Sequence, residues 1–255
     1  MPQPALKANE ISSELVDILA SKTKISEMQF YRYIRDIEKL KDSSSEDYLK
    51  ALAHGAYGRK DVAVAFFKEA LKQKNSIIAQ NYVVYLSDYG TYSELHEAVS
   101  QLVDHFHTQL MVGSAWESNL FMGNIDKAIH YAHKLMGMVD EKDADMLRTL
   151  ASTAKQQYAL FKKTTGISDS EFQDIALRVV GVLDSYKVNP IAVSFFAVPE
   201  EKTSSYVMAV NTFDADVLSD MNLDIAFSLA ENDSLIGKPF SVWFEGGSKE
   251  TIRAC

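Results

Sequence analysis

The sequence predicts a mainly α fold, in which an array of paired helices is followed by a small α+β module of order helix, strand, strand, helix, strand. Three observations predict it. Apolar residues recur with helical spacing through the first two-thirds of the 255 residues. Glycines at predicted turns recur every 32 to 33 residues within that part. Runs of β-branched and aromatic residues appear after Asn189-Pro190.

The repeat is read from three turn glycines, Gly58, Gly90 and Gly123, each of which separates two helical stretches. Side chains five, nine and twelve residues after each glycine are apolar, and the same offsets hold one period earlier, counted from Ile25. The resulting trios are Phe30, Ile34 and Ile37; Ala63, Phe67 and Ala70; Leu95, Val99 and Leu102; and Ala128, Ala132 and Leu135. Because spacings of four and three share one helix face, the trios predict four second helices with one buried stripe.

The pattern predicts helix pairs that run through most of the chain. The pairs are 10–21 with 26–40, 46–57 with 60–73, 76–88 with 92–105, and 109–122 with 125–138. A polar loop with capping residues joins the first two pairs over 41–46. A helix over 143–163 begins a fifth pair, and the turn 164–169 leads into a helix over 171–186.

Residues 123–135, Gly-Asn-Ile-Asp-Lys-Ala-Ile-His-Tyr-Ala-His-Lys-Leu, resemble the turn and second helix of a tetratricopeptide repeat, and residues 58–71 are similar. The resemblance covers about residues 9–138. The family's first-helix signature is poorly kept, since Lys50, Tyr82 and Ala115 stand where a large aliphatic residue is usual. A related helical-hairpin array and an irregular helical bundle remain alternatives.

The C-terminal part predicts a β-hairpin from strands over 191–198 and 206–213, joined by the polar segment 199–205. A helix over 214–231 and a strand over 238–244 follow. The change of period predicts two domains, a helical repeat domain over 1–165 and a small α+β domain over 166–255.

The charge balance disfavours some partners. With 35 acidic and 26 basic residues the net charge is −9, so neither nucleic acid nor an anionic membrane is expected as a partner. No apolar run is long enough to span a bilayer and no signal segment is recognised, so we expect a cytoplasmic protein without membrane insertion. The single cysteine, Cys255, supports neither a disulfide nor a cysteine metal site.

Motifs for chemistry are weak. His130 and His133 share a helix face but lack a third ligand, so no metal is expected. No nucleophile elbow or phosphate-binding glycine loop is present. A grouping of Asp184, Glu200 and Lys202 resembles that of metal-dependent nucleases, although a charged hairpin loop explains it as well. We therefore predict no catalytic residue and no cofactor.

The resemblance implies that first helices line a concave groove. Counted from the turn glycines, the residues predicted to bind a partner there are Tyr48, Leu52, Gln80, Val84, Glu117, Leu120 and Phe121. This surface is apolar and mildly acidic, which favours a protein partner with an apolar or basic helix or extended segment. Four of these residues, Leu52, Val84, Leu120 and Phe121, are expected to form a continuous, partly exposed apolar strip.

The function predicted from the sequence is that of a non-catalytic protein-binding adaptor, chaperone-like or regulatory protein. One alternative is an enzyme, a metal-dependent nuclease or hydrolase, with its active site in the C-terminal module. Another is a structural subunit of a larger assembly. Because three strands leave sheet edges to be covered, a homodimer is also possible.

Overall fold

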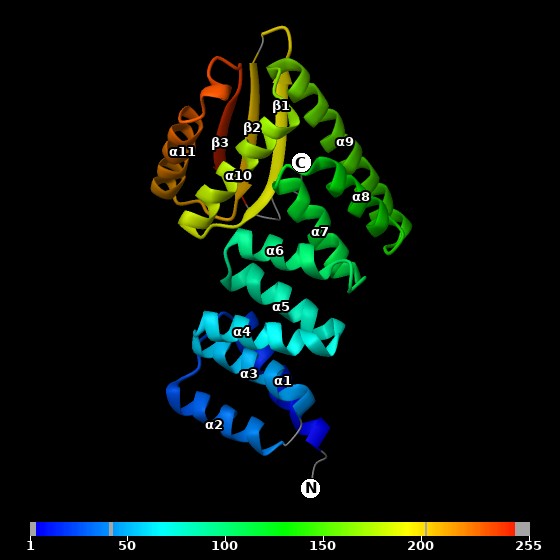
Figure 1. The fold of residues 1–255 in the computed structure, drawn as a ribbon, viewed down its shortest axis with the longest axis vertical. Coiled ribbons are helices and arrows are strands. Elements are labelled where there is room, and N and C mark those ends of the chain that lie inside the picture. Colours follow the sequence, from blue (N-terminus) through cyan, green and yellow to red (C-terminus); the bar gives the residue numbers. More distant parts are fainter. Residues whose placement is uncertain (1–3, 41–42, 202, 248–255) are drawn as a thin grey trace. The chain divides into compact units, whose positions relative to one another are not determined.

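The computed structural model describes residues 4–40, 43–201 and 203–247. It contains two compact units, Met1–Gly90 and Thr91–Cys255. Residues 41–42 of the predicted polar loop, Lys202, and residues 248–255 with Cys255 lie outside the described residues. Helices dominate the chain and a small sheet lies toward its C-terminal end (Figure 1), so the mainly α fold with a small α+β module is confirmed.

The first unit is a stack of helices with contacts between neighbours. Its elements are α1 (Pro4–Ala20), α2 (Glu27–Lys39), α3 (Ser43–Tyr57), α4 (Lys60–Ala70), a 3-10 turn (Leu71–Gln73) and α5 (Ser76–Tyr89). Helix α3 contacts α1, α2 and α4, and α4 contacts α5. Ser26 starts α2 with a capping box to Gln29, and Asn75 caps α5. This arrangement is compatible with a helical repeat.

The predicted stripe of second-helix residues is buried. Of its twelve members all are buried except Ile34 and Leu95, which are partly buried. The turn glycines Gly58 and Gly123 have φ of +91° and +72°, in the left-handed region that favours glycine. A Cβ on Gly123 would also lie 2.9 Å from Ala176 and from Phe172. Gly90 differs, because its backbone is extended.

The second unit combines helices with the sheet. Its elements are α6 (Tyr92–Leu102), α7 (Gln109–Phe121), α8 (Ile125–Met136), α9 (Glu141–Thr165), α10 (Asp169–Tyr186), β1 (Pro190–Val198), β2 (Thr203–Val210), α11 (Ala215–Ala230), a 3-10 turn (Asp233–Leu235) and β3 (Ser241–Gly246). The strand order is β1-β2-β3, with β1 antiparallel and β3 parallel to β2. The predicted order helix, strand, strand, helix, strand is confirmed.

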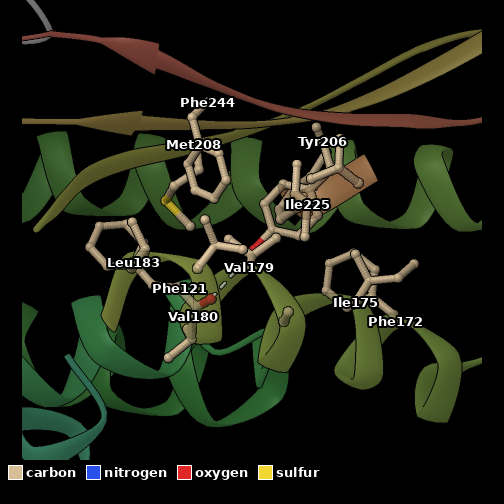
Figure 2. Close-up of a cluster of buried hydrophobic side chains, with 14 of the residues drawn as sticks. Phe121, Phe172, Ile175, Val179, Val180, Leu183, Tyr206, Met208, Ile225 and Phe244 are labelled. Carbon is tan, nitrogen blue, oxygen red and sulfur yellow. Dashed lines mark hydrogen bonds between the residues drawn. The ribbon is translucent and has the colours of Figure 1, made fainter. Parts of the chain in front are cut away.

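One hydrophobic core joins the sheet to the helices of this unit. Figure 2 shows side chains of α10, β2, β3 and α11 directed toward one another between sheet and helices. Phe172 of α10 stacks on Tyr206 of β2 with ring centroids 5.8 Å apart. Phe161 of α9 lies in the same cluster. Helices α9 and α10 therefore belong to the same compact unit as the sheet. The border between the two units falls at 90/91, within the third predicted helix pair. The predicted domain border after residue 165 stays a prediction.

Two side chains, those of Asp184 and Asn222, bond to backbone groups at the start of α6 and on edge strand β3. The Asp184 carboxylate at the end of α10 accepts hydrogen bonds from the Tyr92 and Ser93 amides, at 2.7 and 3.3 Å, and so caps the start of α6. Asn222 of α11 accepts from the Phe244 amide at 2.7 Å and donates to the Phe244 carbonyl at 3.1 Å. These two bonds occupy the amide and the carbonyl of Phe244 on edge strand β3, where another strand would otherwise pair.

Candidate protein-binding surface

The predicted groove residues of the first unit are only partly accessible. Tyr48 is buried, and its hydroxyl accepts hydrogen bonds from Ser12 and Asn81. Leu52 is 1% exposed. Gln80 is half-buried and donates to the Ser76 carbonyl, whereas Val84 is 45% exposed. Of these four, Val84 alone presents a large apolar surface to solvent.

The remaining groove residues lie on α7, in the second unit. Glu117 is exposed and Leu120 is partly buried against the core. Phe121 is 6% exposed, contacts Tyr92 at a ring distance of 6.0 Å, and its carbonyl accepts from the Tyr206 hydroxyl at 3.4 Å. The expected partly exposed strip is therefore wrong for Leu52 and Phe121, because both are core residues. Whether any of the seven residues binds a partner stays a prediction.

The residues that the sequence suggested for metal-dependent catalysis or metal binding do not form a metal site among the described residues. Asp184 caps α6, and Glu200 lies exposed in the turn between β1 and β2. Among the described residues, no group of three or more His, Cys, Asp or Glu side chains is arranged to hold a metal ion. Burial lowers the pKa of His54 and of His96, with further lowering by Arg59 near His54 and by Lys127 near His96. No described helix has the length and apolarity needed to cross a membrane.

A different surface, on α11, combines apolar and acidic side chains. Between residues 211 and 237 the sequence has six carboxylates and neither lysine nor arginine. Asp216, Asp220 and Asp224 recur every four residues and are all exposed. Leu223 is 53% and Phe227 69% exposed. We call these five residues the α11 acidic face.

The geometry of a helix explains why they lie together. Met221 and Ile225 of α11 are fully buried in the core. At 3.6 residues per turn, a residue two positions further on lies about 200° around the helix, so Leu223 and Phe227 point away from that core. The same arithmetic places Asp216 and Asp220 within about 60° of these two side chains, with Asp224 at the border.

The inner side of α11 is firmly held. Fully burying a side chain such as Met221 or Ile225 contributes about 1.5–3 kcal/mol each. Helix α11 packs against α10 and β3 (Figure 1). Arg178 of α10 donates to the Ser228 hydroxyl at 3.1 Å and also bonds the Ser228 carbonyl. The α11 acidic face is therefore preformed, and a partner would not have to order it.

Sequence reasoning recognised this helix but missed its outer face. The helical spacing of Val217, Met221, Ile225 and Leu229 predicts the helix. Apolar residues that lie outside this stripe are the signal that could have revealed the outer face. Leu223 and Phe227 are such residues, and they stand in a segment without a single basic side chain. An exposed apolar pair beside a row of carboxylates can bind a surface of matching shape and opposite charge.

In comparisons with protein-family models, curated proteins and solved structures, nothing significantly matches this chain.

Proposed function

We propose that this protein is a non-catalytic protein-binding protein of the adaptor, chaperone-like or regulatory type, and that it binds a basic amphipathic helix of its partner on the α11 acidic face. The observation that carries the proposal is the exposure of Leu223 and Phe227 beside three exposed aspartates on a helix whose opposite side is anchored in the core. The resemblance of about residues 9–138 to tetratricopeptide repeats favours the same class of function.

Charge decides which occupant fits this face. If a second copy of the chain bound through the same face, the three aspartates of one copy would face the three aspartates of the other. Like charges across an interface are unfavourable. A partner with lysine or arginine beside its apolar residues would pair with the aspartates and cover Leu223 and Phe227. Helix α11 is about 24 Å long at 1.5 Å per residue, which is enough to pack along several turns of a partner helix.

The test uses the full chain and two synthetic amphipathic helices, one built from leucine and lysine and the other from leucine and glutamate. Fluorescence anisotropy should show binding of the lysine helix alone. Replacing Leu223 and Phe227 by alanine should weaken binding by more than about tenfold, as expected for anchors of an interface. Asp216→Asn with Asp220→Asn should weaken it and reduce its dependence on salt.

The matched control is Ile77→Ala on α5, which removes an exposed apolar side chain of similar accessibility at 62%. This variant should bind the lysine helix like the wild type. Equal binding by the Leu223/Phe227 variant and the Ile77 variant would overturn the proposed site. A photo-crosslinker at position 227 should then capture a basic segment of a cellular partner, and capture of an acidic segment or of a second copy would contradict the proposal.

A further inference from the structure

Helices α10 and α11 pack against each other and form a seam on the surface of the second unit. Arg178 of α10 bonds the hydroxyl and the carbonyl of Ser228 on α11. The Tyr186 hydroxyl donates to the Asp224 carboxylate at 2.8 Å. These contacts set the C-terminal half of α10 against the C-terminal half of α11. Phe227 of the α11 acidic face stands between the two contacted residues of α11, so it lies beside this half of α10.

A glycine, Gly181, stands in this half of α10 although the fold does not require it. It is exposed, and its backbone is helical. A Cβ at this position would come within 4 Å of no other described side chain and of no backbone outside its own helix. Alanine would therefore fit, and glycine is the less stable choice in a helix interior because it loses more backbone freedom on folding. The folded chain by itself gives no reason for glycine here.

Gly181 faces away from the core. It is two positions from Val179 and two from Leu183, which are both buried, and two positions correspond to about 200° around the helix. Leu177, one turn earlier, shares the face of Gly181 and is 55% exposed. Ser185, one turn later, turns its hydroxyl back to the Gly181 carbonyl at 2.9 Å. This face of α10 thus presents an apolar side chain beside bare backbone.

The charges along the seam favour a basic partner. Helix α10 has one basic residue, Arg178, and α11 has none. Nε of Arg178 donates to the Asp174 carboxylate at 2.8 Å, so the charge of the arginine is balanced within α10. Lysine or arginine of a partner is therefore not repelled here, and the exposed aspartates of the α11 acidic face attract it.

We infer that the basic amphipathic helix of the partner lies in the seam between α10 and α11, over Gly181, rather than along α11 alone. The inference rests on the proposed function and specifies how the same partner is seated. Glycine lets the partner backbone approach α10 closely. Leu177 contacts the partner from α10 and Phe227 contacts it from α11, while basic side chains of the partner reach Asp220. A helix laid over two packed helices covers more apolar surface than a helix laid on one.

The test adds a side chain at Gly181 in the full chain and measures binding of the leucine–lysine helix by fluorescence anisotropy. Gly181→Ala should raise the melting temperature by about 1–4 °C, because alanine favours the helix and fits the open space. Gly181→Gln should also keep the fold, yet it should weaken binding by about tenfold or more, because its side chain takes the place of the partner backbone. Leu177→Ala should weaken binding and leave the melting temperature nearly unchanged.

Ala159→Gln is the matched control, because Ala159 is an exposed small residue on helix α9 of the same unit. This variant should bind the lysine helix like the wild type. Circular dichroism follows the melting of each variant.

The outcomes separate this inference from the proposed function. Wild-type affinity in the Gly181→Gln or the Leu177→Ala variant, with binding still lost in the Leu223/Phe227 variant, would overturn the seating in the seam and leave the proposed function standing. A drop in the melting temperature of either Gly181 variant would show that the fold itself requires glycine, and this would also overturn the inference. Absence of binding by the wild-type protein would contradict the proposed function and the inference together.

Discussion

At the scale of single residues, the structure separates the predicted groove residues by depth. Leu52 and Phe121 are buried, whereas Val84 and Glu117 are exposed to solvent. Helix α7 illustrates the difficulty, because its buried residues surround much of its circumference. Periodicity identifies a buried stripe only when the opposite side is polar. For α7, the periodicity of the sequence could not show which apolar side chain is exposed.

The matched pair Phe121 and Phe227 tests this distinction. Phe121→Ala should lower the free energy of unfolding by about 3–5 kcal/mol, because it leaves a cavity in the core between α7, α6 and the sheet. Phe227→Ala should change it by less than about 0.5 kcal/mol, as is usual for an exposed position. Urea denaturation measures both. Similar losses of unfolding free energy for the two variants would contradict the burial of Phe121 or the exposure of Phe227.

At the scale of the element, the start of α10 shows how a local signal acquires a tertiary partner. Ser168 and Glu171 form a capping box, which the sequence signature Ser-x-x-Glu indicates. The Glu171 carboxylate also accepts from Nζ of Lys238 at 2.7 Å, and Lys238 precedes β3. The Lys238 ammonium, together with the Ser168 hydrogen bonds, lowers the pKa of Glu171 to about 2.

This lowered pKa predicts a pH-dependent stability. A carboxyl whose pKa falls from its usual 4.5 to about 2 on folding stabilises the fold above pH 4.5, and the contribution is lost as the pH falls toward 2. Glu171→Gln keeps a capping side chain but removes the charge, so it should lower the melting temperature at pH 7. The gap to the wild type should close between about pH 4.5 and 2. A gap that is constant with pH would contradict the lowered pKa of Glu171 in the folded protein.

At the scale of the whole molecule, the chain contains two compact units, and their border at Gly90 is not a change in secondary structure. The predicted border after residue 165 follows the change from helical to strand spacing. Within the second unit, however, Phe161 of α9 packs with Phe172 and Phe195, at ring distances of 5.9 and 6.0 Å. Helices that precede the predicted border therefore contribute to the core of the sheet.

Two fragments decide between these borders. Residues 91–255 should fold cooperatively, because the core cluster of the sheet draws all its members from this range. Residues 166–255 lack Phe161, Tyr92, Phe121 and Ile125 of that cluster, so they should unfold at much lower denaturant or remain unfolded. A stable, cooperative fragment 166–255 would support the border after residue 165. Circular dichroism in urea measures the outcome.

The sequence by itself determined the identity and order of the helices and strands, because spacing, capping residues and turn glycines act over a few neighbouring residues. Ser26, Gly58 and Gly123 hold their predicted places for that reason. The sequence also contained the acidic segment 211–237. Only the tertiary structure decided that Phe121 is buried while Phe227 is exposed, and that Asp184 caps a helix whose first residue lies 92 positions before it in the chain. These properties depend on contacts between distant segments, which local periodicity does not encode.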